Sequence, residues 1–473
     1  MTKHNMYDLV IVGMGAAGLA AAASCHDASG GRARIAVIER APSDQRGGAT
    51  RWTNAALRLN DDGEFDPDWK HLVSQQSNGL ADATYCEIME ANVMEALDYV
   101  KGFGVEIEKL PLFALGFHES GGGTHAMWQP VGGGASIVHH VGDAVDAHKH
   151  TDVFYETEAV SLHLEDGLVA GVNVRGADGR IRPLLGKAVL LACGGFEGNP
   201  EMLTQYLGER AVDLVPIAPG ILNNTGDGIR MAMNIGAGTS GQFDMIHAEG
   251  VDPRSRKADA VVWSYLFGIV VNAQGERFFD EGASTLDRTF ERLGWEIWRN
   301  QNQKAFLIGD RKYMANPYSA ALNVTDIAPV VADTIEQLAN QLGIDAEGLG
   351  RTVAAFNAAV PGTRIDPSRP DGAATTGINP PKSNWAESVS EGPFYGFPLT
   401  GAVTFTFGGL KTDSDGRVLT PTGRAIPGLY AAGEITGLFY HEYACATSVL
   451  RSITFGRRVG LRIGAELPVP VTQ

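Results

Sequence analysis

Residues 7–18 read YDLVIVGMGAAG, an apolar run that leads directly into a Gly-x-Gly-x-x-Gly pattern. The run at 7–12 is typical of a buried parallel strand, and the Ala-rich stretch after residue 18 is typical of a helix. A second apolar strand is expected at 35–38, and Glu39 follows it. Strand, glycine turn, helix, second strand and terminal acid in this order predict a Rossmann-type βαβ unit that binds a dinucleotide.

Each glycine has a physical role in such a unit. Gly13 permits the tight turn, Gly15 lets the backbone approach the pyrophosphate, and Gly18 allows the helix to pack closely on the strand. The helix start offers free N–H groups to phosphate, and Glu39 is placed to accept hydrogen bonds from ribose hydroxyls. The cofactor-binding residues predicted from this unit are Gly13, Gly15, Ala16, Ala17, Gly18, Glu39 and Arg40. NAD would satisfy the same unit, so the choice of cofactor depends on later segments.

Three later segments favour FAD. A glycine-rich polar loop, RGGATR, lies at 46–51, a buried strand that closes in glycines lies at 187–195, and GLYAAGE lies at 428–434. These pieces match those with which large two-dinucleotide-binding flavoproteins enclose FAD, and NAD dehydrogenases lack the late GLYAAGE. Thr447 and Ser448, at the start of the last expected helix, suit backbone donation to flavin O2. The further predicted FAD contacts are Gly47, Gly48, Ala49, Thr50, Ala159, Ala192, Gly194, Asp227, Gly433, Glu434, Thr447, Ser448 and Val449.

Composition narrows the class of protein. The chain has 473 residues, 44% of them hydrophobic, which suits a globular protein of two or more domains. A net charge of −17 argues against a nucleic-acid or anionic-membrane partner. The four cysteines, Cys25, Cys86, Cys193 and Cys445, form no CxxC pair, so no metal site is predicted. No apolar run of ~18 residues suggests a membrane span, and the early first strand leaves no room for a leader, so a cytoplasmic location is expected.

Ordered motifs along the chain resemble the fumarate reductase/succinate dehydrogenase flavoprotein family almost end to end. The matching segments are VGMGAAG, RGGATR, VLLACGGFEGNPEM (189–202), NNTGDGIRMAMNIGA (223–237), GERFFDEG (275–282), GLYAAGE and ITFGRR (453–458). Within the family, FDEGAS, TFTFGGLKTD (404–413) and LFYHEY (438–443) resemble tricarballylate dehydrogenase-like proteins.

The resemblance implies an α/β fold in which a Rossmann-type FAD-binding domain carries an inserted α+β capping domain. The FAD-binding domain would comprise residues 1–244 and 405–473, and the capping domain residues 245–404. Within the cap, residues 331–359 have helical periodicity, interrupted by a glycine turn. Residues 361–394 are rich in Pro, Gly, Asp and Ser, which indicates a loop.

The resemblance also bears on how FAD is held. Succinate dehydrogenase-like members attach FAD through a histidine just before the Thr of the early glycine-rich loop. Ala49 stands at that position here, and an alanine side chain cannot form the histidyl–flavin bond. Non-covalent FAD is therefore expected.

Family members move a hydride between flavin N5 and one carbon of a CH–CH or C=C bond next to a carboxylate or carbonyl, while a protein group handles the proton on the neighbouring carbon. Most of the fumarate-binding set is absent: the family's arginine positions fall on Thr285 and near Tyr443, its Thr-Glu pair on Ala260 and Val261, and its second histidine on Phe405 or Thr404. Fumarate and succinate are therefore not expected as substrates.

Several functions stay open at this point. The leading hypothesis is a tricarballylate dehydrogenase-like enzyme that takes a small carboxylate and exchanges electrons with an unidentified donor or acceptor. The first alternative is a ketosteroid Δ1-dehydrogenase-like desaturase of a cyclic ketone, because the lost polar contacts favour a less charged pocket. The second is a non-catalytic FAD electron-transfer subunit. A flavin monooxygenase is a further alternative, although its usual late GD motif is GE here.

The candidate catalytic residues are Arg288, His247, Tyr443 and His441. Arg288 is the basic residue nearest to the vacant arginine slot at Thr285, and the alternative is an exposed arginine that opens the following helix. His247 fits the family's substrate-binding histidine after TGDG. Tyr443 and His441 are placed to donate to a substrate carbonyl or to transfer a proton, unless they only pack against the flavin ring.

A loop near residue 130 is a weaker candidate for the cavity wall. It combines Gln129 with three consecutive glycines at 132–134. His125 and Trp128, just before it, are either further walls of the site or ordinary packing residues.

Overall fold

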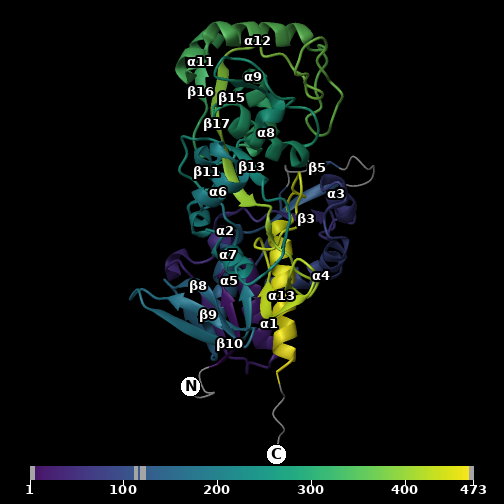
Figure 1. The fold of residues 1–473 in the computed structure, drawn as a ribbon. Helices are drawn as coiled ribbons and strands as arrows, with labels where there is room; N and C mark the ends of the chain where they lie inside the picture. The colour runs from purple at the N-terminus through teal and green to yellow at the C-terminus, as the bar shows by residue number, and fades with distance from the viewer. Residues whose placement is uncertain (1–5, 111–115, 118–123, 468–473) are drawn as a thin grey trace, which may run out of the picture.

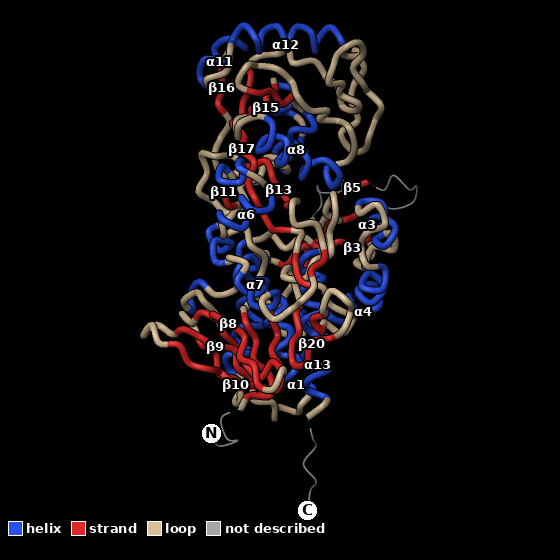
Figure 2. The backbone as a smooth tube through the Cα atoms, in the orientation of Figure 1, coloured by secondary structure: helices blue, strands red, loops and turns tan. Residues whose placement is uncertain are grey.

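The computed structural model describes residues 6–110, 116–117 and 124–467 (Figure 1). The large sheet lies at the end of the molecule that holds β1 and the end of α13, and a second sheet with its helices lies toward the opposite end (Figures 1 and 2). The fold is α/β, as predicted, and the elements that position the site come from both parts.

The predicted βαβ unit is confirmed at the centre of the large sheet. β1 (Tyr7–Val12) and β2 (Ile35–Ile38) are parallel neighbours, and α1 (Ala16–Ala28) connects them. The second half of β10 (Ile181–Leu191) pairs with the other side of β1, and β20 (Ala425–Ala431) continues the sheet in parallel. The central strands are buried, as expected for a parallel sheet that is covered on both faces. Their carboxyl ends therefore meet at one edge, where a ligand of this fold binds.

The rest of this sheet and the last helix complete the domain core. The order along the sheet is β19-β20-β10-β1-β2-β7, with an antiparallel β8–β9 pair added to the first half of β10. The remaining strands are β7 (Thr151–Phe154), β8 (Glu158–Glu165), β9 (Leu168–Arg175) and β19 (Arg417–Leu419). The last helix is α13 (Ser448–Ala465).

A glycine seam brings α13 against α1. A Cβ on Gly456 would lie 2.2 Å from the carbonyl oxygen of Ala17, and one on Gly460 would lie 2.3 Å from that of Ala21. Gly464 continues the seam one turn later. Since only glycine permits this backbone approach, the middle of α13 is held beside the start of α1, and α13 begins about two turns before that contact. The N-terminal residues of both helices line one cavity, and each helix start has a positive dipole end and N–H groups without a partner inside the helix.

The second sheet is built on one long strand, β17 (Phe394–Thr406). β13 (Ile246–Val251) and β15 (Ala305–Gly309) pair with it, and β14 (Ile269–Asn272) pairs with β15. The helix α8 (Leu286–Asn300) packs on β13 and β17. Two short strands, β11 (Val215–Pro216) and β16 (Val330–Ala332), extend the sheet.

The helical periodicity at 331–359 is confirmed as two helices, α11 (Ile335–Leu342) and α12 (Ala346–Ala359). Residues 361–393 form neither helix nor strand, as expected from their composition. β17 crosses the predicted domain boundary between 404 and 405, and β11 joins the second sheet from the first predicted segment. The boundaries at 244 and 404 stay predictions.

The other elements surround these two sheets. The helices are α2 (Gly48–Trp52), α3 (Trp69–Gln76), α4 (Ala83–Lys101), α5 (Gly134–Ala147), α6 (Pro200–Leu207), α7 (Asp227–Met233), α9 (Arg311–Ala315) and α10 (Pro317–Ala321). The strands are β3 (Leu57–Asn60), β4 (Ile107–Lys109), β5 (Gly116–Phe117), β6 (Thr124–Pro130), β12 (Thr239–Ser240) and β18 (Gly409–Leu410).

Candidate active site

A large cavity opens where the carboxyl ends of the central strands meet the second sheet. On one side it is lined by the turns after β1, β2, β10 and β20 and by the starts of α1 and α13; on the other it is lined by β13, β17 and α8. The predicted FAD contacts that line it are Gly13, Gly15, Ala16, Ala17, Glu39, Arg40, Gly48, Ala49, Thr50, Ala159, Ala192, Gly194, Asp227, Gly433, Glu434, Ser448 and Val449. Gly18, Gly47 and Thr447 are not among the lining residues.

The glycine turn after β1 has the close contacts that its pattern predicts. Gly13 has φ +102°, and a Cβ there would lie 2.4 Å from the carbonyl oxygen of Ala192. A Cβ on Gly18 would lie 2.0 Å from the carbonyl oxygen of Gly13, so Gly18 acts in packing rather than at the cavity. The Ala16 N–H donates to Oγ1 of Thr50 at 3.0 Å, which ties the helix start to the early glycine-rich loop.

Two charged residues that follow β2, Glu39 and Arg40, line the cofactor side of the cavity. Glu39 is 6% exposed and accepts hydrogen bonds from the N–H groups of Met14 and Ala41. Burial raises the pKa of its carboxyl, against the effect of those hydrogen bonds. Arg40 and Asp227 form an ion pair at 2.5 Å across the cavity wall.

These features fit FAD. Two helix N-termini face the cavity, the main chain at Gly13 and Gly15 is open to a pyrophosphate, and a Cβ on Gly48 would meet nothing within 4 Å. In addition, Oγ1 of Thr404 and Nε of Arg451 are buried, belong to cavity-lining residues and have no hydrogen-bond partner among the described residues. A bound cofactor would supply the missing partners.

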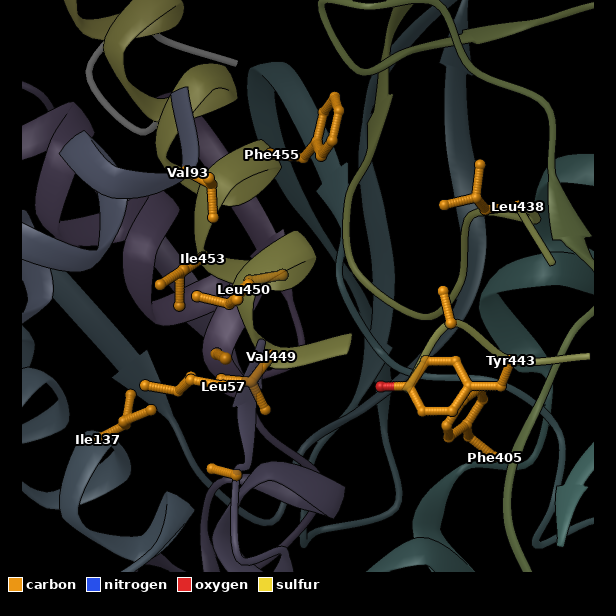
Figure 3. Packing of buried hydrophobic residues seen from close by; sticks show 14 of the residues in the cluster. Leu57, Val93, Ile137, Phe405, Leu438, Tyr443, Val449, Leu450, Ile453 and Phe455 are labelled. Atoms are coloured by element: carbon orange, nitrogen blue, oxygen red, sulfur yellow. The ribbon is translucent and has the colours of Figure 1, made fainter. Parts of the chain in front are cut away.

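The hydroxyl of Tyr443, which precedes α13, is hydrogen-bonded to the start of that helix. The Tyr443 oxygen accepts hydrogen bonds at 2.9 Å from the N–H groups of Thr447 and Ser448 and from the Ser448 hydroxyl. Figure 3 shows the Tyr443 ring beside Phe405, with its hydroxyl directed toward Val449. The N–H groups that were expected to bind flavin O2 therefore bond to Tyr443 in this structure. Their contact with the flavin stays a prediction.

Beyond this tyrosine, a buried histidine lies between two carboxylates. His247, on β13, is 4% exposed, and its Nδ1 lies 2.6 Å from Glu291 on α8. Its Nε2 lies 3.3 Å from Glu249, two residues along the same strand. Burial alone would lower the pKa of His247, but the hydrogen bonds to Glu249 and Glu291 outweigh burial and raise it to about 9. The imidazole is thus protonated at neutral pH.

Further charged side chains line this end, which we call the substrate end: Arg58, His247, Glu249, Asp259 and Asp287. Arg58, on β3, is 5% exposed; its Nε donates to Asp66 at 2.6 Å and its Nη1 lies 3.8 Å from Asp287. Asp259 accepts a hydrogen bond from the Asn54 amide at 2.7 Å and has a left-handed backbone, φ +59°. Both cations at this end thus have carboxylate partners within the protein.

Comparison with known proteins identifies the scaffold. A family model described as an FAD binding domain matches residues 8–448. The chain belongs to the fumarate reductase/succinate dehydrogenase flavoprotein family. This flavoprotein is 26% identical to fumarate reductase (cytochrome) of Shewanella frigidimarina over 97% of the chain and 77% of that protein. It is 27% identical to vinyl phenol reductase of Lactiplantibacillus plantarum over 97% of both chains. It is 32% identical to 3-oxosteroid 1-dehydrogenase of Mycobacterium tuberculosis over 66% of the chain and 59% of that protein.

Solved structures share the fold of the flavoprotein. The open conformation of a flavocytochrome c3 fumarate reductase matches 98% of this chain and 78% of its own, with 22% identity and a TM-score of 0.77. A 3-ketosteroid delta1-dehydrogenase from Sterolibacterium denitrificans matches 98% of this chain and all of its own, with 20% identity and a TM-score of 0.74. The flavoprotein is an FAD-dependent oxidoreductase that acts on CH–CH or C=C bonds. In the described part of the chain, no helix has the length and apolar character needed to cross a membrane.

The structure brings only some of the predicted catalytic residues of the flavoprotein to the cavity. His247 and Tyr443 line it. Arg288 is half-buried in the first turn of α8 and is not among the lining residues. His441 is exposed, and its backbone N–H donates to Gln242 at 2.7 Å. Their catalytic roles stay predictions.

The weaker wall candidates lie elsewhere. Gln129 bonds to Glu108 at 2.9 Å, and Trp128 donates to the carbonyl oxygen of Asn60. The glycines at 132–134 lead into α5 and do not line the cavity. The side chain of His125 lies outside the described residues.

Sequence reasoning missed Arg58, Glu249, Asp259 and Glu291. One signal was available: His247 and Glu249 are two residues apart in a strand, so both side chains point to the same face. Arg58 stands between two leucines, and nothing in that local pattern distinguishes a site residue from an ordinary strand arginine.

Proposed function

We propose that this flavoprotein transfers a hydride between flavin N5 and a C=C or CH–CH bond conjugated to a ketone or another uncharged carbonyl. The observation that supports this most directly is the charge of the substrate end. Three carboxylates, Glu249, Asp259 and Asp287, line it against two cations, His247 and Arg58. A substrate carboxylate would meet like charges there, and such an arrangement disfavours binding.

The pairing of the two cations strengthens this argument. To bind His247, a substrate carboxylate would have to displace Glu249 or Glu291. To bind Arg58, it would have to compete with Asp66, which is fully buried and bonds to the guanidinium at 2.6 Å. Breaking either buried pair would leave a carboxylate unpaired in a medium of low dielectric constant, which is unfavourable.

The remaining wall of the substrate end suits an apolar, ring-shaped substrate. Its members share large apolar or aromatic side chains, namely Leu57, Trp263, Leu286, Phe290, Phe405 and Tyr443. Two of the relatives carry names that refer to uncharged substrates, a 3-oxosteroid and a vinyl phenol. Both observations favour the cyclic-ketone alternative over the tricarballylate-like one.

Tyr443 is the residue to which we assign the substrate carbonyl. The N–H groups of Thr447 and Ser448 occupy the two lone pairs of its oxygen, so its own hydrogen is available to the Ser448 hydroxyl, 2.9 Å away, or to a substrate carbonyl. The positive end of the α13 dipole and these bonds both strengthen the hydroxyl as a donor. Polarising the carbonyl makes the conjugated bond reactive toward hydride transfer.

Asp259 is the residue to which we assign the proton on the neighbouring carbon. Unlike Glu249 and Asp287, it has no cation within salt-bridge distance among the described residues. Burial, with a smaller contribution from nearby Glu249, raises the pKa of Asp259 to about 7, against the opposing effects of a hydrogen bond from the Asn54 backbone and of His247 and Lys257. A carboxyl that titrates near neutral pH is suited to both releasing and accepting a proton.

The test follows the flavin absorbance band under anaerobic conditions with defined probes. Oxidised enzyme is mixed with a saturated 3-ketosteroid or with tricarballylate, and reduced enzyme with 2-cyclohexen-1-one or with fumarate. We expect the ketone and the enone to react at least ~100-fold faster than the carboxylates, because like charges across a binding site oppose binding by several kcal/mol. Faster reaction of tricarballylate would instead support the tricarballylate dehydrogenase-like hypothesis.

A charge variant sharpens the same test. Glu249→Gln removes one carboxylate from the substrate end and leaves Asp259, the residue assigned to the proton, in place, so the preference for uncharged probes should fall by ~10-fold. Asp326→Asn is the control, because Asp326 is an exposed carboxylate that does not line the cavity. An unchanged preference in Glu249→Gln would contradict the electrostatic argument.

A further inference from the structure

A buried arginine in the cavity wall has no paired carboxylate. Arg451, on the first turn of α13, is 2% exposed and lines the cavity. Its Nη1 donates to the carbonyl oxygen of Thr436 at 3.1 Å, and its guanidinium lies 4.9 Å from the Phe439 ring centroid. Within the part of the chain that the structure describes, its Nε has no hydrogen-bond partner. Among the described residues, no carboxylate lies within salt-bridge distance of it.

The other buried arginines of the chain do not share this arrangement. Arg46 pairs with two aspartates, Arg58 with Asp66 and Arg277 with Glu281. A guanidinium cannot escape the penalty of burial by losing its proton, so a buried arginine needs a counter-charge. Arg451 therefore lacks the partner that its environment demands.

The groups around Arg451 do not supply a full counter-charge. Burial raises the pKa of Tyr85 and of Cys86, on α4, to about 12, so both are neutral. The remaining group is Glu434, whose pKa burial raises and Arg451 lowers across a distance longer than an ion pair. Glu434 itself lies beside the buried carboxyl of Glu197. The unsatisfied Nε of Arg451 and the place of this buried side chain in the cavity wall both point to a ligand as the missing partner.

We propose that Arg451 is the counter-charge for the reduced flavin and raises its midpoint potential. Transfer of one hydride, which carries two electrons and one proton, leaves the flavin ring with one additional negative charge. Arg451 lies less than one helical turn beyond Ser448, at the helix start that is expected to face the flavin ring. A fixed cation there stabilises the reduced ring more than the oxidised ring, and charges near the ring are an established means of tuning flavins.

The experiment replaces the charge while it keeps the volume. Arg451→Met holoenzyme is titrated against a redox dye of known potential, and FAD affinity is measured for the oxidised and the reduced forms. We expect reduced FAD to be weakened ~10–100-fold more than oxidised FAD, because a nearby opposite charge changes ionic equilibria by that order. For a two-electron couple, this ratio corresponds to a midpoint potential lower by about 30–60 mV.

A matched control is available on the same helix. Arg457 also stacks on an aromatic ring, Tyr99, but it is paired with Glu95 and does not line the cavity. Arg457→Met should leave the midpoint potential unchanged. Equal weakening of oxidised and reduced FAD in Arg451→Met would overturn the proposal, as would an unchanged potential. If Arg451→Met does not fold, Arg451→Gln, which retains a donor for Thr436 without the charge, carries the same expectation.

Discussion

The two ends of the cavity are built in different ways. At the cofactor end, the main chain does the binding: glycines at 13, 15 and 48 expose backbone, and two helices present their N-termini. At the substrate end, side chains from β3, β13, α8 and the loop around Asp259 bring their charges together. The first kind of site depends on local backbone geometry, whereas the second depends on how distant segments pack.

This difference explains what the sequence could predict. Both strands of the βαβ unit were predicted to the residue, and the helix between them was predicted but begins at Ala16 rather than after residue 18, because a glycine turn between a strand and a helix is a local pattern. The substrate end was not predicted, because Arg58 and Glu291 are far apart in sequence. They can be related to one site only after β3 and α8 have packed around the same cavity. The motif ITFGRR marked the family, but the Gly456–Gly460–Gly464 spacing that seats α13 on α1 became clear only in the structure.

The largest effect is expected from a substitution at the cofactor end of the cavity. Gly18→Val places a side chain where the Gly13 carbonyl oxygen already lies 2.0 Å from a Cβ position, and backbone cannot yield there as a flexible side chain can. We expect complete loss of bound FAD, read from the ratio of flavin to protein absorbance in the purified protein. Gly350→Ala is the control: a Cβ there meets nothing within 4 Å, and replacing a glycine within α12 should stabilise the protein by about 0.5–1 kcal/mol. A Gly18→Val protein with full FAD would show that the turn is not rigid.

The next largest effect is expected at the substrate end, where replacing His247 should lower the free energy of unfolding. His247→Gln removes the cation between Glu249 and Glu291, and removing one partner of a buried ion pair destabilises a protein by about 3–5 kcal/mol. Urea unfolding of the holoenzyme measures the loss. The control is His163→Gln, since His163 and Glu165 form a more exposed pair at 3.4 Å whose removal should change stability by at most about 1 kcal/mol.

His247 also makes the free energy of unfolding depend on pH. The folded-state pKa of His247 is about 9, above the ordinary value of 6.5, so folding favours the protonated form. Its contribution is therefore complete below pH 6.5 and is lost as the pH rises toward 9. Wild-type stability should fall across this window more steeply than that of His247→Gln. Parallel curves would show that the imidazolium does not hold the two carboxylates together.

The smallest expected effect concerns Arg288, the basic residue nearest to the family's vacant arginine position at Thr285. Arg288 occupies the first turn of α8 without lining the cavity, whereas Asp287 beside it does line the cavity and lies 3.8 Å from Arg58. We therefore expect Arg288→Ala to change the rate of flavin reduction by no more than about twofold, as for a substitution away from the site. Arg58→Met should lower the same rate by ~100-fold, because it leaves Asp66 unpaired and removes a cation from the substrate end. The reverse order would show that Arg288 reaches the cavity when substrate binds.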